Sequence, residues 1–257
     1  MTALAASAAA DSVSAPRSRF GGVWRIVRLL AVKPSVFFGV PWLILAGALV
    51  VSLAIALIIQ GAGAPAAETI KGARYSWAVL SPQWYLVAVG VQAVGLTFSF
   101  ALGFSSTRRD FWLGMSLMFV LVAAEMAAAI ATLVQIEKAT NGWFIGAGMF
   151  NALWYGQNGW LFDFFSSFAL QLFVLFVGAA ATTIFMRWRM KGMLTLTAVA
   201  IVGVLGTVAA LTFSGSWPAV FSWFATIGLW GVFTLLLGLA VVFAVLGYIV
   251  IRRATPR

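Results

Sequence analysis

The strongest candidate for chemistry in this chain is a short charged stretch, SSTRRDFWLG, which covers residues 105–114. It places Arg108, Arg109 and Asp110 next to one another between two long apolar runs. One explanation is a simple membrane turn, because basic residues hold a turn on one side and Asp110 can accept backbone N–H groups at a helix start. The other explanation is a docking site for a partner protein.

Catalytic chemistry has few other candidates. The 257 residues include no histidine, no cysteine and six acidic residues, so imidazole or thiolate metal sites, haem ligation and disulfides are excluded. The chain also lacks the phosphate-binding pattern GxxxxGK(S/T). We therefore expect no enzymatic activity, no metal site and no cofactor. ATP and Mg²⁺, if they are used at all, must be bound by a separate protein.

Glu125 is the one acidic residue deep inside an apolar run. A charge at that depth costs roughly 2.5–3.5 kcal/mol on insertion scales, and intramembrane acids are often functional. Two explanations stay open. Glu125 contacts a proton or a substrate, or it makes a hydrogen bond to another helix that holds the bundle together.

The composition identifies an integral membrane protein. Hydrophobic residues make up 63% of the chain and charged residues 9%, whereas soluble domains carry about 25% charged residues. The net charge of +10 would suggest nucleic acid as a partner of a soluble protein. Here the placement of the basic residues accounts for it, so we expect membrane lipids and no nucleic acid as partners.

Six apolar segments are long enough to cross a bilayer as helices, which takes about 20 residues each. They are residues 36–60, 82–104, 111–136, 164–186, 193–213 and 227–251. The runs are continuous, without the polar and apolar alternation of a membrane β-barrel. The predicted fold is an all-α integral membrane protein with six transmembrane helices.

The basic residues set the predicted orientation, because cytoplasmic loops are rich in Lys and Arg. Six spans put both termini on the same side of the membrane, and most of the Lys and Arg residues lie on that side. The other side has only Lys71, Arg74 and Lys138. Both termini are therefore predicted to be cytoplasmic. The basic residues of that side are Arg17, Arg19, Arg25, Arg28, Lys33, Arg108, Arg109, Arg187, Arg189, Lys191, Arg252, Arg253 and Arg257.

The chain divides into three predicted regions. Residues 1–17 are rich in Ala and Ser and lack the apolar centre of a signal peptide, so we expect a disordered cytoplasmic tail. Residues 18–34 can place Val23, Trp24, Val27, Leu29 and Leu30 on one helical face, away from the arginines. This pattern favours an amphipathic interfacial helix over an extension of the first span. Residues 35–257 form the six-span domain.

Several polar and small residues in the spans have two explanations each. Gln92 and Ser99 lie seven residues apart in the second span and therefore on one helix face. Gly203 and Thr207 give the fifth span a face of small side chains. Each set either lines a translocation path or packs against a neighbouring helix. The glycine- and aromatic-rich loop 137–163 is predicted to be partly folded back at the headgroup level. Residues 214–226 form either a re-entrant half-helix or an aromatic belt.

Taken together, these features resemble the permease subunits of ABC transporters of the type-2 exporter family. The run GFSSTRRDFWLGMSL is similar to the GxxRxxFxxG stretch of bacterial members, and the topology resembles theirs over nearly the whole chain. The long loop 137–163 departs from the family's better-known members.

The resemblance implies a homodimer or a pair with a sister permease, in a bacterial cell membrane, with two cytoplasmic ATPases docked beneath. It implies a coupling helix between spans 2 and 3, flanked by the interfacial helix, and a path lined by Gln92, Ser99, Gly203 and Thr207. The coupling residues would be Ser106, Thr107, Arg108, Arg109, Asp110 and Phe111.

Two other functions remain as alternatives. One is a gradient-driven secondary carrier that uses Glu125 as its proton site. Carriers of this kind often contain two related halves, and residues 36–136 show no convincing similarity to residues 164–251. The other is a membrane anchor for a larger assembly, without transport activity of its own.

Overall fold

The computed structural model describes residues 19–103 and 106–253. The predicted tail, residues 1–17, therefore lies outside the described residues. All regular elements in the described chain are helical, in agreement with the predicted all-α fold. The longer helices are α2 (Arg19–Ala31), α3 (Val40–Gly61), α4 (Ala66–Ala73), α5 (Ser81–Gly95), α6 (Phe98–Gly103), α7 (Arg108–Ala139), α8 (Trp160–Phe213) and α9 (Trp217–Ile251).

Shorter helical segments connect these helices. A π-helical turn, Ser35–Gly39, follows Lys33 and Pro34 and leads into α3. A 3₁₀ turn, Ala78–Leu80, precedes α5, and a second π-helical turn, Gly142–Gly146, follows α7. The observed first span, Ser35–Gly61, agrees with the predicted span of residues 36–60.

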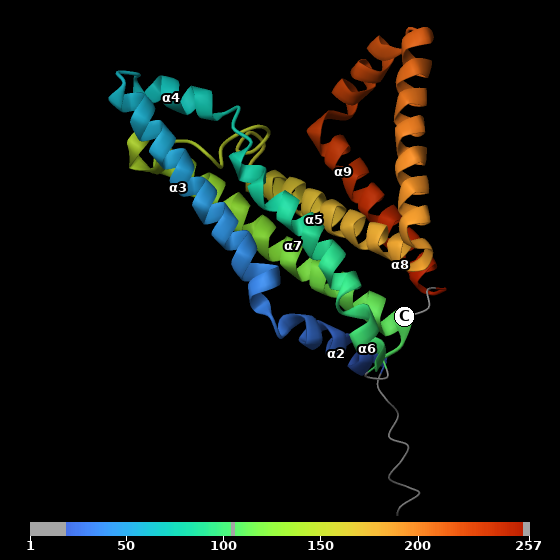
Figure 1. Cartoon of the computed structure of the whole chain (residues 1–257). Coiled ribbons are helices and arrows are strands. Elements are labelled where there is room, and N and C mark those ends of the chain that lie inside the picture. Colours follow the sequence, from blue (N-terminus) through green and yellow to red (C-terminus); the bar gives the residue numbers. More distant parts are fainter. Residues whose placement is uncertain (1–18, 104–105, 254–257) are drawn as a thin grey trace, which may run out of the picture.

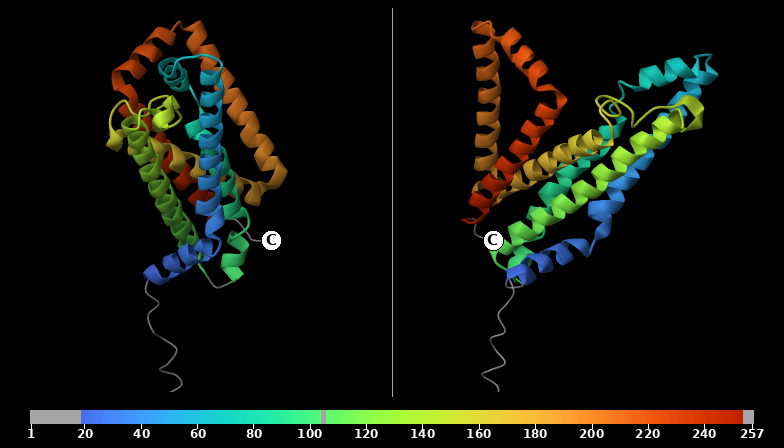
Figure 2. Two further views of the ribbon diagram at one scale, coloured as in Figure 1. Left: turned by 90° about the vertical axis from the view of Figure 1, so that its left-hand side faces the viewer. Right: turned by 180° about the vertical axis from the view of Figure 1, so that it is seen from behind.

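The molecule has two arms that diverge like a V (Figure 1). One arm is a bundle of α3, α5, α7 and the first half of α8, and the other is made of the second half of α8 and the first part of α9 (Figures 1 and 2). We call the end of the bundle that carries residues 106–108 the turn end. The opposite end, which carries α4 and residues 140–159, is the loop end.

Five helical stretches of the described chain are long and apolar enough to cross a membrane. The fourth, α8, has 54 residues, which at 1.5 Å per residue gives about 80 Å of straight helix. The hydrocarbon core is only about 30 Å thick. α8 is therefore too long for a single straight crossing, and it covers both predicted spans 164–186 and 193–213. The long apolar helices fit a helical membrane protein, and the count of six spans stays a prediction.

α8 is broken at Arg189, whose backbone angles are φ 55° and ψ −144°. The break lies among Arg187, Arg189 and Lys191, in the predicted cytoplasmic turn between the fourth and fifth spans. The Arg187 guanidinium lies 4.4 Å from the centre of the Trp188 ring. Charged residues are unfavourable inside lipid, and at this point α8 turns sharply (Figure 1).

Two predicted spans differ from single straight helices. Residues 82–104 were expected as one helix, but a turn at residues 96–97 separates α5 from α6. The Thr97 hydroxyl donates to the carbonyl of Ala93, and such bonds of Ser and Thr bend helices. In α9, Gly228 has φ 60°, so a helix beginning at Trp217 precedes the predicted span 227–251. The half-helix is present, and whether it re-enters the membrane stays a prediction.

The bundle is held together by close contact between α5 and α8. A Cβ atom at Gly90 would overlap the carbonyl oxygen of Leu175, and one at Gly178 would overlap that of Val87. Small residues let membrane helices approach backbone to backbone. The sequence prediction placed such a small face in the fifth span, but a Cβ added at Gly203 or Gly206 would meet no atom within 4 Å. Within the described chain, this backbone-to-backbone contact joins the second and fourth predicted spans, and packing through the small face of the fifth span stays a prediction.

The loop after α7 is folded around one buried carboxylate. Glu137 is 3% exposed, and its oxygens accept hydrogen bonds from four groups of the loop. The donors are Trp143 Nε1 at 2.9 Å and the backbone N–H groups of Met149, Phe150 and Asn151 at 3.0, 2.8 and 3.0 Å. Met149, Phe150 and Tyr155 pack with residues of α3 and α7. The predicted folded-back loop is thus an ordered cap on the loop end.

Replacing Gly178 by Ala should force α5 and α8 apart, because the new Cβ has no space beside Val87. We expect a loss of about 1–3 kcal/mol, as for other overpacked cores. The measurement is thermal unfolding of the detergent-purified chain. Gly47→Ala is the matched control, since a Cβ there meets nothing within 4 Å. Equal melting temperatures for the two variants would contradict the close contact.

Replacing Glu137 by Ala should release the loop, because it leaves the four donors without their acceptor. A buried unsatisfied donor costs about 1–3 kcal/mol, so residues 140–159 should become accessible to proteases. Limited proteolysis with mass spectrometry measures this. In the control, Glu68→Gln removes an exposed carboxylate paired with Lys71 at 2.7 Å, and cleavage should stay at the level of the unmodified chain.

Candidate functional site

The turn before α7 begins with a side-chain cap. Thr107 accepts a hydrogen bond from the backbone N–H of Asp110 at 3.0 Å, so Thr107, and not Asp110, is the capping residue. Asp110 lies in the first turn of α7, where its charge faces the positive end of the helix dipole. The sequence placed the carboxylate at the correct helix end, but missed Thr107 as the cap.

Helix α2 packs directly against the start of α7. Gly114 of α7 faces α2 so closely that a Cβ would lie 2.6 Å from Ile26 Cβ and 2.7 Å from the carbonyl oxygen of Val23. A Cβ at Gly22 would lie 2.7 Å from the Asp110 carboxylate. The predicted helix is therefore confirmed as a helix, and its two glycine contacts attach it to the turn.

The buried face of α2 differs in part from the predicted apolar face. Ile26, Val27 and Leu30 are buried, whereas Trp24 is 49% exposed. Arg25 and Arg28 are exposed, as expected. The difference arises because α2 packs on α7, and the side that meets Gly114 is centred on Ile26.

Arg108 and Phe111 connect the turn to two further helices. Arg108 Nη1 donates to the carbonyl oxygen of Arg252 at 2.6 Å, the residue that caps the C-terminus of α9. A cation is favourable at this end of a helix. Phe111 is fully buried and contacts Phe98 of α6 edge to face, with ring centroids 5.2 Å apart. The turn is thus braced by α2, α6 and α9.

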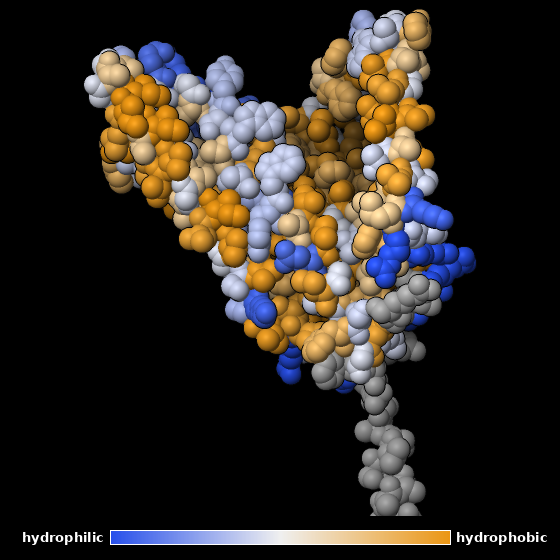
Figure 3. Space-filling view, viewed as in Figure 1, coloured by the Kyte–Doolittle hydropathy of each residue, from blue (hydrophilic) through white to orange (hydrophobic). Residues whose placement is uncertain are grey.

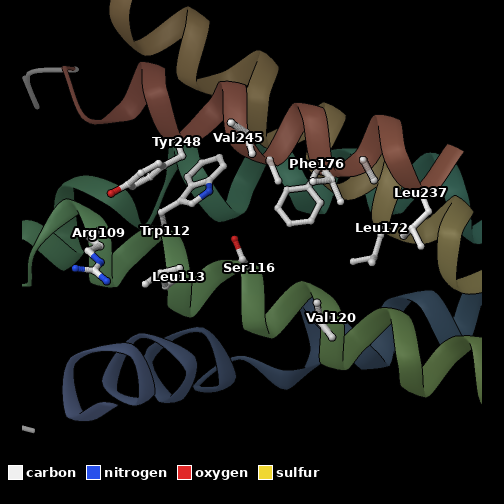
Figure 4. A pocket seen from close by; sticks show the side chains of 13 residues that line it. Arg109, Trp112, Leu113, Ser116, Val120, Leu172, Phe176, Leu237, Val245 and Tyr248 are labelled. Atoms are coloured by element: carbon white, nitrogen blue, oxygen red, sulfur yellow. The ribbon is translucent and has the colours of Figure 1, made fainter. Parts of the chain in front are cut away.

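Arg109 lies at the edge of an apolar groove between α7, α8 and α9 (Figure 4). The groove has a volume of about 580 Å³. Ser116 is a polar residue inside it, and Tyr248 lines the same groove (Figure 4). Most other lining residues are apolar, among them Trp112, Val120, Leu172, Phe176 and Leu237. The groove accordingly suits an apolar molecule or chain, with a cation near one end.

The single chain does not bring the four predicted path residues together. Gln92 is exposed and lines a separate groove of about 260 Å³ beside α2. Ser99 is exposed on α6. Gly203 and Thr207 are exposed on the second half of α8, where the Thr207 hydroxyl donates to the Gly203 carbonyl at 2.8 Å. Their role in a path stays a prediction.

Glu125 has a hydrogen-bond partner on another helix. Its Oε1 accepts from Trp42 Nε1 of α3 at 2.9 Å. Both side chains lie at the surface of the bundle and not in its core. This observation agrees with the structural explanation for Glu125, and the proton-binding explanation remains untested. Trp42 itself carried no sequence signal as a partner.

Several buried polar side chains lie along α8, and the sequence prediction identified only Asp163 among them, as a carboxylate at the start of the fourth span. Asp163, Ser167 and Gln171 are fully buried at successive four-residue intervals, so they share one helix face. Asp163 accepts from Gly156 N at 2.9 Å and from Gln135 Nε2 at 3.4 Å. Polar residues every four positions in an apolar run were the available signal. No group of three acidic residues among the described residues forms a candidate metal site.

Comparison with known proteins gives no match: no family model, no curated protein and no solved structure is similar to this chain.

The contact between α2 and the turn can be tested at Gly114. A valine there would clash with Ile26 and displace α2, with an expected cost of about 1–3 kcal/mol. Thermal unfolding and protease cleavage within residues 19–31 measure the effect. Gly103→Val is the control, because Gly103 is helical and a Cβ there meets nothing within 4 Å. Unchanged protection of α2 in Gly114→Val would disprove the contact.

Proposed function

We propose that the chain is a transmembrane permease subunit of an ABC transporter of the exporter type. It crosses a bacterial cell membrane six times, with both termini in the cytoplasm. It forms the translocation path and has no enzymatic activity of its own. A separate cytoplasmic ATPase binds ATP and Mg²⁺ and docks on Ser106, Thr107, Arg108, Arg109, Asp110 and Phe111.

The observation that carries this proposal is the bracing of the turn. A docking element that drives a transporter must pass a displacement on to the spans. Here the turn contacts α2 through Gly22 and Gly114, α9 through Arg108, and α6 through Phe111. A simple connecting turn needs none of these contacts. Arg109 remains exposed beside them and is available to a partner.

The second arm supports pairing with another permease. Residues 190–213 of α8 include no buried residue, and neither do residues 217–228 of α9. Their surface is largely apolar, and the face drawn in Figure 3 shows apolar residues on both arms. Gly203 and Gly206 have open space beside them on this arm, and small residues of this kind permit close helix association. A second permease, identical or related, would cover it within the membrane.

Both alternative functions have less support. A proton-coupled carrier would need Glu125 in a site that opens to each side of the membrane in turn, whereas Glu125 is bonded to Trp42 on the surface of the bundle. A simple membrane anchor would explain the apolar helices. It would not explain why the turn is braced by three helices.

Reversing the charge of Arg108 and Arg109 tests the docking role. The double variant Arg108→Glu, Arg109→Glu should lose the co-purifying ATPase and its ATP hydrolysis, because two positive charges at the proposed contact become negative. The full chain is purified from its native membrane in mild detergent. ATP hydrolysis and the amount of a subunit with a phosphate-binding GxxxxGK(S/T) motif are then measured.

Arg187→Glu, Lys191→Glu is the matched control, since it makes the same charge change at the break in α8. Assembly and ATP hydrolysis should persist in this control. If the double variant at the turn retains both as well, docking through the turn is disproved. Transport by the isolated chain without ATP would reject the proposed function as a whole.

A further inference from the structure

The loop end carries three described basic residues with different environments. Lys71 forms an ion pair with Glu68 at 2.7 Å. Lys138 donates to the carbonyl oxygen of Gly156 at 2.8 Å, which leaves two of its N–H donors free. The Arg74 guanidinium makes no hydrogen bond or ion pair with any residue that the structure describes. Five donors of Arg74 are therefore unused.

Arg74 and Lys138 line the same cavity, which has a volume of about 270 Å³. Its other lining residues include Asn151, Tyr155 and Gln157, and none of them is acidic. The cavity is large enough for a phosphate or carboxylate group together with water, because one water molecule takes up about 30 Å³ in the liquid. Two cations and two amides at one small cavity provide donors for an anion.

The walls of this cavity are fixed by one backbone hydrogen bond and one side-chain hydrogen bond. Leu153 N donates to the carbonyl oxygen of Arg74 at 2.8 Å, which ties the loop to the end of α4. Gln157 Nε2 donates to the carbonyl oxygen of Leu153 at 2.7 Å. Leu153 adopts φ 59°, which is unfavourable for a leucine, and Gly156 adopts φ 76°. This conformation brings the segment from Asn151 to Gln157 around Lys138.

The acidic groups close to the cavity are already engaged. Glu137 directs both oxygens at N–H groups of the loop. Asp163 is fully buried and accepts from Gly156 and Gln135. Burial raises the pKa of Tyr155 to about 12, so its phenol is neutral at pH 7 and adds no negative charge. Neither carboxylate lines the cavity, and the Arg74 guanidinium is left for an external anion.

We propose that this cavity binds one anionic group, a phosphate or a carboxylate, through Arg74 and Lys138. Arginine suits this role because its planar fork can bond two oxygens of such a group at once. The site lies at the opposite end of the bundle from the docking turn, so it does not depend on the proposed function. The group belongs either to a lipid headgroup at the membrane surface or to a small soluble anion.

Binding is tested on the full-length chain in neutral detergent. Calorimetric titration with inorganic phosphate measures a soluble anion, and native mass spectrometry with added phosphatidylglycerol or phosphatidylcholine measures a lipid. We expect one bound phosphate or one bound phosphatidylglycerol. The Arg74→Gln variant should weaken this binding about tenfold, the usual effect of losing a charge-assisted hydrogen bond. Lys138→Gln should weaken it similarly.

Lys71→Gln is the matched control, because it removes one positive charge from α4 outside the cavity, and its affinity should stay within about twofold of the unmodified chain. Arg74→Gln removes no hydrogen bond or ion pair with a described residue, so its melting temperature should be unchanged. A loss of affinity in this variant then reports on the cavity and not on unfolding.

Binding of phosphate indicates a soluble anion, and binding of phosphatidylglycerol alone indicates a lipid headgroup. Three outcomes would overturn the proposal. They are no binding of phosphate or phosphatidylglycerol, equal binding of phosphatidylcholine and phosphatidylglycerol, or an equal loss of affinity in Arg74→Gln and Lys71→Gln.

Discussion

The contact between Gly90 of α5 and Gly178 of α8 is the constraint on which the rest of the bundle depends. Inside a membrane there is no hydrophobic drive to bring helices together, so close packing must supply the attraction. These two glycines allow the helices to touch backbone to backbone. α7 then packs against the first half of α8, and α3 is held alongside. With larger residues at this crossing, the helices could not approach in the same way.

The two ends of the bundle are built on different chemistry. At the loop end, the carboxylate of Glu137 gathers the N–H groups of the following loop, and the ordered loop forms a cavity with two cations. At the turn end, Arg108 donates to the carbonyl oxygen of Arg252, the residue that caps the C-terminus of α9, and glycines bring α2 onto α7. Each end thus uses one charged side chain to satisfy backbone groups that a helix or loop leaves unpaired.

The break at Arg189 gives the molecule its two arms. Up to this residue α8 belongs to the bundle, and after it the helix has no buried residue. The apolar surface of the second arm has no partner within the described chain. It therefore faces either lipid or another protein. In the proposed permease pair, the second arm would be the region where the two subunits meet.

Local sequence was enough to predict the helical membrane class, the approximate limits of most apolar helices, and the carboxylate of Asp110 in the first turn of α7. Those properties follow from composition, because apolar length and charge decide where a helix can lie in lipid. The three-dimensional packing was needed to show which glycines bring helices together, that Glu125 bonds Trp42, and that Glu137 organises a loop. The same holds for the shared cavity of Arg74 and Lys138. These pairings join residues from different helices and loops, and no spacing along the chain specifies which distant residues meet.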